Sequence, residues 1–326
     1  MRSFLRRFPF YLPMAHFLYG LISCFSPHFS QKHGGDNGGM SSARYCYSVW
    51  LRHLTQLYAN GMQHIPRSVA ELGPGDSIGT GLCALLSGAD CYYAFDVTRH
   101  TDIEASLAIF DELVALFTQK AQIPGPDEFP EMMPSLNDYS FPSHILSDNM
   151  LSNTLSVARV EIIRGCLRQE APKAAENDIC LRYIVPWTNY EGTFPKVDLI
   201  FSQAVLEHVD MLADTYRILA DILNPCGFMS HQIDFRCHGT AAKWNGHYAY
   251  SERMWQLMRG KRPYLINRTG LGTHLEMAAK AGFEVLETTR VTAGGGMAHA
   301  KRDALFTDLS PEDLDTASAF LVLKKS

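Results

Sequence analysis

A glycine-rich loop between two short apolar segments constrains the fold of this chain more than any other feature of its sequence. The stretch SVAELGPGDSIGTGLCALLSGADCYYAFDV, residues 68–97, predicts a buried strand, a loop with Gly73 and Gly75, a helix and a second strand. Glycine lets such a loop approach a ligand closely, because no side chain blocks the backbone. The stretch therefore predicts a nucleotide-type binding loop at the end of a strand.

Short apolar segments alternate with helical patterns along most of the chain. Such alternation predicts an α/β fold whose sheet is mostly parallel and carries helices on both faces. The strands that we expect are, in chain order, 68–73, 91–97, 178–185, 197–203, 227–234, 283–291 and 318–325. A helix with one apolar face, ending at Gly61, precedes the first of them.

Two intervals are too long to be ordinary connections in such a sheet. Residues 99–177 begin with a helical pattern and continue into a Pro-rich stretch. This interval predicts a helical insertion between the second and third strands that covers the site as a lid or flanks it. Residues 235–275 form a second excursion. A polar, Gly-rich linker divides the chain into an N-terminal segment with linker, 1–42, and one domain, 43–326.

The N-terminal segment carries basic residues ahead of an apolar stretch, the order expected of a signal or anchor sequence. Its basic residues are Arg2, Arg6 and Arg7, and its apolar stretch is interrupted by Pro9, Pro13 and His16. The stretch barely reaches the length of about 20 residues that a membrane-spanning helix needs. Three interpretations stay open: a transmembrane anchor, an amphipathic segment on a membrane surface, and a segment that docks on the domain.

Composition limits the partners and the compartment. The chain has 326 residues, a net charge of −5 and a pI near 6.2, whereas a protein that coats nucleic acid is normally basic, so we do not expect a nucleic-acid partner. Its eight cysteines include no CxxC pair, which argues against a zinc cluster and a disulfide framework. We expect a cytoplasmic protein without a metal site, or one associated with a membrane surface. The sequence does not indicate an oligomeric state.

The spacing of the loop glycines separates two classes of nucleotide-binding loop. A dinucleotide loop needs a third glycine three positions after the second, and that position is Ile78. The acidic residue before the two glycines instead resembles the acidic-x-Gly-x-Gly loop of class I methyltransferases that use S-adenosylmethionine (SAM). This resemblance implies that SAM is the cofactor and is held by Glu71, Gly73, Pro74 and Gly75.

A second motif adds to the resemblance. Class I methyltransferases commonly have an Asp followed by a hydrophobic run, a small or polar residue, a "vLEHv" turn and an "L.PGG" segment. Here Asp198, Ser202, VLEHV at 205–209 and LNPCGF at 223–228 stand in these places. Cys226 departs from the pattern, because glycine is usual at that position. As a whole, the chain resembles bacterial methyltransferase-domain proteins, which implies a Rossmann-like class I methyltransferase fold.

The resemblance implies roles for several residues beyond the loop. Asp96, at the end of the second strand, is expected to accept hydrogen bonds from the two ribose hydroxyls, because a carboxylate can take both. Ser202 and Gln203 are expected to line the pocket near the methionine end of SAM. Glu207 and His208 are expected chiefly to fix the turn into the next helix by hydrogen bonds to backbone.

The acceptor side of the site is predicted from residues near the fifth strand. A hydroxyl acceptor needs a base, and histidine titrates near neutrality. His231 is the candidate base, and Asp234 and His247 are candidate substrate contacts, because they follow one another at the carboxyl end of that strand. The alternative is that His231 is a buried strand histidine with a structural role.

The prediction is therefore a SAM-dependent methyltransferase of class EC 2.1.1. We favour a sugar hydroxyl in glycan synthesis as the acceptor, by analogy alone. A small metabolite or a lipid is the alternative acceptor. Two alternatives belong to other classes: an NAD-dependent dehydrogenase and a non-catalytic protein with the SAM-binding fold.

Overall fold

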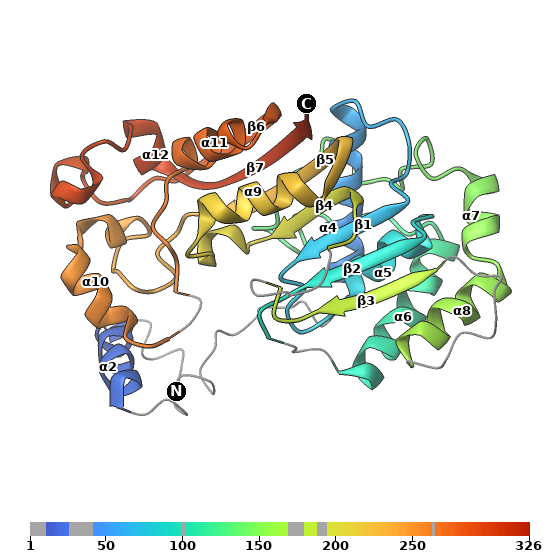
Figure 1. Cartoon of the computed structure of the whole chain (residues 1–326), viewed down its shortest axis with the longest axis horizontal. Helices are drawn as coiled ribbons and strands as arrows, with labels where there is room; N and C mark the ends of the chain where they lie inside the picture. Colours follow the sequence, from blue (N-terminus) through green and yellow to red (C-terminus); the bar gives the residue numbers. More distant parts are fainter. Residues whose placement is uncertain (1–10, 26–41, 99–101, 169–178, 188–193, 263–264) are drawn as a thin grey trace.

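Seven strands form one sheet in the order β3-β2-β1-β4-β5-β7-β6 (Figure 1). This computed structural model describes residues 11–25, 42–98, 102–168, 179–187, 194–262 and 265–326. All neighbouring strands are parallel except β7, which runs antiparallel to β5 and β6. The strands are β1 (Ser68–Leu72), β2 (Cys91–Phe95), β3 (Cys180–Ile184), β4 (Val197–Gln203), β5 (Leu223–Asp234), β6 (Phe283–Thr292) and β7 (Thr316–Lys325). The predicted α/β fold, a seven-stranded and mostly parallel sheet with helices on both faces, is confirmed.

Helices bury both faces of this sheet (Figure 1). One face shares a core with α4 (Ala43–Ala59), α5 (Gly79–Leu86), α6 (Ile103–Thr118), α7 (Asp148–Thr154) and α8 (Val157–Leu167). The other face shares a core with α9 (Leu212–Ile222) and α11 (Leu271–Lys280). Shorter or peripheral elements are α2 (Tyr11–Phe25), α10 (Glu252–Arg259), α12 (Pro311–Asp315) and the 3-10 turns η1 (Leu206–His208), η2 (Gly246–Ala249), η3 (His299–Lys301) and η4 (Ala304–Phe306).

The order of the strands reverses at β1. From β1 the chain proceeds outward to β2 and β3, and it then returns to the other side of β1 to form β4. Loops that leave β1 and β4 therefore separate to opposite faces, which opens a crevice at the carboxyl ends of these strands. The predicted cofactor loop follows β1 directly and lies at this crevice.

The helix α4 is largely buried. Its N-terminus is capped by Ser42, whose side chain accepts a hydrogen bond from the backbone N–H of Tyr45 (3.2 Å). Its predicted apolar face is buried as expected and consists of Tyr47, Trp50, Leu51, Leu54 and Leu57. Two polar side chains, Arg52 and His53, are buried with them and need partners in the core.

The described part of the insertion, 102–168, flanks the sheet. Apolar residues of α6 and α8 belong to the same core as α4 and α5. Its Pro-rich stretch is held by the buried guanidinium of Arg52, which donates hydrogen bonds to the carbonyl oxygens of Met132 (2.7 Å), Pro134 (2.9 Å) and Pro124 (2.9 Å). These bonds satisfy backbone groups that have no sheet or helix partner.

The N-terminal helix α2 docks on α10, in the second excursion (Figure 1). The two helices approach closely: a Cβ added to Gly20 would lie 2.2 Å from the carbonyl oxygen of Met258. Ser23 accepts a hydrogen bond from the backbone N–H of Lys261 (2.9 Å), and Arg262 donates one to the carbonyl oxygen of His16 (3.1 Å). Among the residues of the ranges given above, no helix is long and apolar enough to cross a membrane. Residues 1–10 lie outside the described part of the chain.

Gly81 in α5 is predicted to be intolerant of any side chain. A Cβ at this position would lie 1.9 Å from the ring of the fully buried Tyr92. We expect Gly81→Ala to lower the free energy of unfolding by about 1–3 kcal/mol, as overpacked cores do, measured by urea denaturation. Gly294→Ala is the matched control, because nothing lies within 4 Å of its Cβ position. Equal losses in the two variants would contradict the packing described here.

Candidate active site

The loop between β1 and α5 contains two glycines in the left-handed region. Gly73 has φ +61° and Gly75 has φ +67°, a backbone conformation that other residues rarely adopt. The N–H of Gly73 donates to the carbonyl oxygen of Phe95 at the end of β2 (2.8 Å). On its other side, a Cβ at Gly73 would lie 2.7 Å from the side chain of Val205, after β4. Both glycines are therefore required by the path of the loop, while Pro74 between them is buried.

Asp96 lies immediately beside this loop. Leu72 and Phe95 are paired in register, so the residues that follow them, Gly73 and Asp96, leave the sheet at the same level. The side chain of Asp96 accepts hydrogen bonds from the next backbone N–H (2.7 Å) and from the hydroxyl of Tyr183 (3.3 Å). The structure thus brings together the two features that the sequence predicted separately, the glycine loop and the acidic residue.

Glu71 occupies a different environment from the loop glycines. It is 2% exposed, and one of its carboxylate oxygens accepts a hydrogen bond from the hydroxyl of Tyr92 (2.5 Å). Burial raises the pKa of Glu71 to about 8, although the hydrogen bond from Tyr92 opposes this rise and the nearby Asp96 adds to it. The carboxyl group is therefore largely protonated at neutral pH. Its predicted role toward the cofactor stays a prediction.

Ser202 and His231 form a buried pair across β4 and β5. They are neighbours in the parallel register, and the Ser202 hydroxyl lies 2.8 Å from His231 Nδ1. Both residues are fully buried, and burial lowers the pKa of His231 to about 3, so the imidazole is neutral at physiological pH. A neutral imidazole can accept a proton, but complete burial favours the structural alternative, in which His231 orients Ser202.

Gln203 joins three parts of the fold at the same sheet edge. Its Oε1 lies 3.0 Å from Nε2 of His53 on α4, and its Nε2 donates to the carbonyl oxygen of Met133 in the insertion (3.1 Å). The other nitrogen of His53 lies 2.7 Å from the Ser230 hydroxyl of β5. Gln203 is therefore positioned by protein contacts, and its predicted contact with the cofactor stays a prediction.

Asp234, predicted as an acceptor contact, forms an ion pair at the end of β5. Arg236 donates to both of its carboxylate oxygens (2.9 and 2.7 Å) and also reaches Glu131 in the insertion (2.5 Å). Burial alone would raise the pKa of Asp234, but hydrogen bonds from His238 and Arg236 hold it well below the usual range. The carboxylate is therefore ionised, and the pair connects the insertion to the second excursion.

Asp234 and His247 meet at one small cavity. Glu207, Asp234, His247 and Asn267 are among its lining residues. His247 is fully buried, its pKa is lowered by burial to about 3, and its Nδ1 has no hydrogen-bond partner among the described residues. The two candidate acceptor contacts, predicted from separate stretches of sequence, therefore share one polar cavity.

Asn267 is a structural residue of this region that the sequence did not single out. Its side-chain amide donates to the carbonyl oxygens of Leu206 (2.8 Å) and Val209 (2.9 Å), and its backbone N–H donates to that of Glu207 (2.6 Å). It thereby fixes the turn after β4 that carries Glu207. No local sequence pattern predicts such a contact, because 58 to 61 positions separate Asn267 from the two carbonyl groups that its side chain binds.

A larger cavity lies at the opposite edge of the sheet. Its volume is about 470 Å³, and its lining includes His64 and Ile65 before β1 and Ser87 and Gly88 after α5. These positions adjoin the amino-terminal ends of β1 and β2. None of the predicted site residues lines this cavity, so the larger cavity is not the predicted cofactor or acceptor site.

Comparison with known proteins yields solved structures of methyltransferases at low identity. No family model matches the chain, and no curated protein matches it. A SAM-dependent methyltransferase from Mesorhizobium loti is 15% identical, with a TM-score of 0.40 and coverage of 84% of this chain and 98% of that one. The N-methyltransferase NodS from Bradyrhizobium japonicum WM9, in complex with S-adenosyl-L-homocysteine, is 12% identical, with a TM-score of 0.38 and coverage of 89% of each chain. A SAM-dependent methyltransferase from Methanosarcina mazei is 10% identical, with a TM-score of 0.41 and coverage of 82% of this chain and 96% of that one. At these identities no residue role is carried over.

The raised pKa of Glu71 predicts a specific dependence of stability on pH. The folded protein retains a proton on Glu71 that the unfolded chain loses above about pH 4.5. The stability that this proton contributes is therefore fully present below pH 4.5 and is lost as the pH rises toward 8. Glu71→Gln stays neutral, and we expect it to be more stable than the wild type by about 4 kcal/mol at pH 8 and by less than about 1 kcal/mol at pH 5. Urea denaturation at both values measures this, with the exposed Glu284→Gln as control. A pH-independent difference would refute the protonated state.

Proposed function

We propose that this chain is a SAM-dependent methyltransferase that transfers a methyl group to a small-molecule or glycan acceptor. One observation carries the proposal: the left-handed glycines of the β1–α5 loop and the carboxylate of Asp96 lie side by side at the carboxyl ends of β1 and β2. Ligands of open α/β sheets bind at this edge, where the strand order reverses. A carboxylate there suits a ribose diol, because it can accept both hydrogen bonds.

The surrounding residues fit the cofactor chemically. Gly73 and Gly75 have no side chains, so their backbone groups can contact a ligand directly. In this proposal Asp96 binds the ribose. The remaining residues of the cofactor site are those predicted from the sequence, namely Glu71, Pro74, Ser202 and Gln203.

The same geometry weighs against the alternatives from other classes. In a dinucleotide-binding loop, the third glycine allows close packing of helix and strand and the helix N-terminus faces a pyrophosphate. Here the residue before α5 is Ile78, whose side chain is buried and makes no capping hydrogen bond. A non-catalytic relative would not need to keep the loop glycines and the acidic residue, and this chain keeps both.

SAM supplies a methyl group that its sulfonium charge already activates. The chain's main task is then to align the acceptor with that methyl group, an effect worth up to about 10 kcal/mol. A hydroxyl acceptor would also need a base. His231 stays the proposed base because its Nε2 has no partner among the described residues, although its burial and its lowered pKa favour the structural alternative. In the structural alternative it only orients Ser202.

A polar acceptor is supported by the polar side chains between the fifth strand and the second excursion, although the cavity there, of about 10 Å³, holds no more than one water molecule. Asp234 and His247 line it and are the proposed acceptor contacts. Carboxylate and imidazole groups suit hydrogen bonds to a polyhydroxylated ring, so a sugar hydroxyl in glycan synthesis is the acceptor that we favour. A small metabolite or a lipid remains the alternative.

We also propose that the cytoplasmic protein can rest on an anionic membrane surface through α2 and α10. Several apolar side chains of these neighbouring helices are exposed: Leu12, Met14, Leu18, Ile22 and Phe25 of α2, and Met254 and Leu257 of α10. Residues spaced by four, such as Met14, Leu18 and Ile22, share one face of a helix. The arginines that precede α2 in the sequence would add attraction to anionic lipid.

Replacing Asp96 tests the cofactor site. We expect Asp96→Ala to weaken SAM binding by about 10- to 100-fold, because hydrogen bonds to a charged group contribute about 1.5–3 kcal/mol. Isothermal titration calorimetry measures the affinity, and Asp308→Ala, at an exposed position, is the control. Unchanged affinity would refute the role of Asp96, and binding of NAD in place of SAM would refute the proposed function.

Replacing exposed apolar residues of α2 tests the membrane proposal. We expect the double variant Leu18→Ser, Ile22→Ser to reduce binding to vesicles that contain phosphatidylserine by about tenfold or more, because less apolar surface is buried. Cosedimentation measures the bound fraction. Val157→Ser, which removes an 81% exposed side chain from α8, is the matched control. If both variants bind the vesicles as the wild type does, this surface does not contact the membrane.

A further inference from the structure

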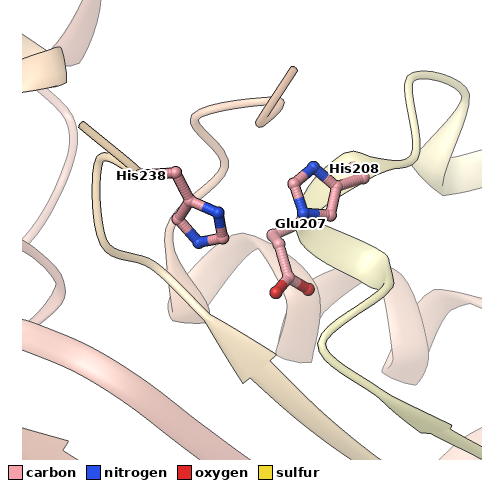
Figure 2. A group of neighbouring side chains, drawn as sticks. All are labelled: Glu207, His208 and His238. Carbon is pink, nitrogen blue, oxygen red and sulfur yellow. The ribbon is translucent and has the colours of Figure 1, made fainter. Parts of the chain in front are cut away.

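Three side chains of metal-binding type converge beside the proposed cofactor loop. Glu207 and His208 belong to η1, the turn that follows β4, whereas His238 follows β5 in the second excursion. Figure 2 shows the imidazole of His238 opposite the side chains of Glu207 and His208, which come from a separate segment. Ligand atoms of the three residues all lie within 4.8 Å of one another.

The carboxylate of Glu207 has one oxygen without a partner. Oε1 accepts the backbone N–H of Asp234 (3.2 Å), which ties the turn to the end of β5 and agrees with the predicted backbone hydrogen bonding of this residue. Oε2 is buried and has no hydrogen-bond partner in the described part of the chain, and the residue is only 2% exposed. A buried polar atom without a partner is destabilising, the more so when it is charged. A cation next to Oε2 would satisfy it.

The two imidazoles are placed to share such a cation with Glu207. The ring centroids of His208 and His238 lie 5.3 Å apart, at an interplanar angle of 79°. Two ligand atoms that are each about 2.1 Å from one tetrahedral ion lie about 3.4 Å apart. Because the ligand atoms of the three residues all lie within 4.8 Å of one another, binding an ion requires their separations to shorten by at most about 1.4 Å.

The charges around the three residues favour a cation. Glu131 and Asp234 both pair with one guanidinium, that of Arg236, so these three side chains together carry one more negative than positive charge. Asp234 also lies 3.5 Å from Nε2 of His238. A carboxylate next to a metal-binding histidine commonly orients its ring. Asp234 can therefore position His238 without itself being a ligand.

We propose that Glu207, His208 and His238 bind one divalent transition-metal ion. A set of two imidazoles and one carboxylate suits Zn²⁺, Fe²⁺ or Co²⁺, whereas Mg²⁺ and Ca²⁺ prefer oxygen ligands. Three protein ligands leave coordination positions open to an oxygen from outside the chain. The sequence contains no CxxC pattern and places His238 30 positions after the adjacent Glu207 and His208, so spacing did not indicate this site.

The position of the ion suggests what it would contact. Val205, two residues before Glu207, lies against Gly73 of the cofactor loop, and Glu207 lines the cavity that Asp234 and His247 share. An ion here would hold an oxygen of the acceptor next to the methyl-transfer crevice. This role rests on the proposed function, whereas binding of the ion does not.

Titration of metal ions into the full chain tests the proposal directly. The protein is first freed of metal with a chelator, and Zn²⁺, Co²⁺ and Mg²⁺ are then titrated separately by calorimetry. We expect one equivalent of Zn²⁺ to bind, and His238→Asn to weaken this binding at least about tenfold. Asparagine is chosen because residue 238 has φ +48°, which asparagine tolerates better than most residues. His64→Asn, at an exposed position on the opposite edge of the sheet, is the matched control.

Two further measurements make the outcomes decisive. The visible absorption of the Co²⁺-loaded protein reports its ligands and should change in Glu207→Gln and His238→Asn but not in His64→Asn. Circular dichroism of the same samples confirms that each variant is folded, and SAM affinity is measured separately. If the wild type binds no stoichiometric Zn²⁺, or if all variants bind it equally, the metal site is refuted while SAM binding still stands. If Zn²⁺ binds as expected and SAM does not, the proposed function fails instead.

Discussion

Parallel pairing of β1 with a neighbour on each side is the constraint on which the candidate site depends. Leu72 lies opposite Phe95 of β2 on one side and opposite Ser202 of β4 on the other, so the three strands reach the crevice in register. A shift of β2 against β1 by two residues would preserve the buried faces but separate Gly73 from Asp96. The hydrogen bond from Gly73 to the Phe95 carbonyl fixes the loop at this level.

Polar groups inside the core fix the helices and the insertion relative to the paired strands. His53 of α4 bridges Ser230 and Gln203, and Arg52 holds three carbonyl groups of the insertion. Because burial lowers the pKa of His53 to about 4, this histidine is neutral at physiological pH and does not need a counter-charge. Such contacts tie the helices and the insertion to the same edge of the sheet that holds the site.

The second excursion connects the cofactor crevice to the rest of the molecule. It supplies His238 and His247 to the polar region beyond β5, and its Asn267 clamps the turn that carries Glu207. It also carries α10, on which α2 docks. A single segment therefore bears one proposed acceptor contact, His247, one proposed metal ligand, His238, and the α10 part of the proposed membrane-facing surface.

The sequence by itself determined the features that depend on neighbouring residues. Alternating apolar segments predicted the seven strands, and the spacing of Glu71, Gly73 and Gly75 predicted the loop, because a turn between a strand and a helix is a local structure. The tertiary structure alone decided which side chains meet across the fold. The burial of His231 against Ser202 and the approach of His238 to Glu207 depend on strand order and on a long excursion, and neither leaves a local pattern that spacing could reveal.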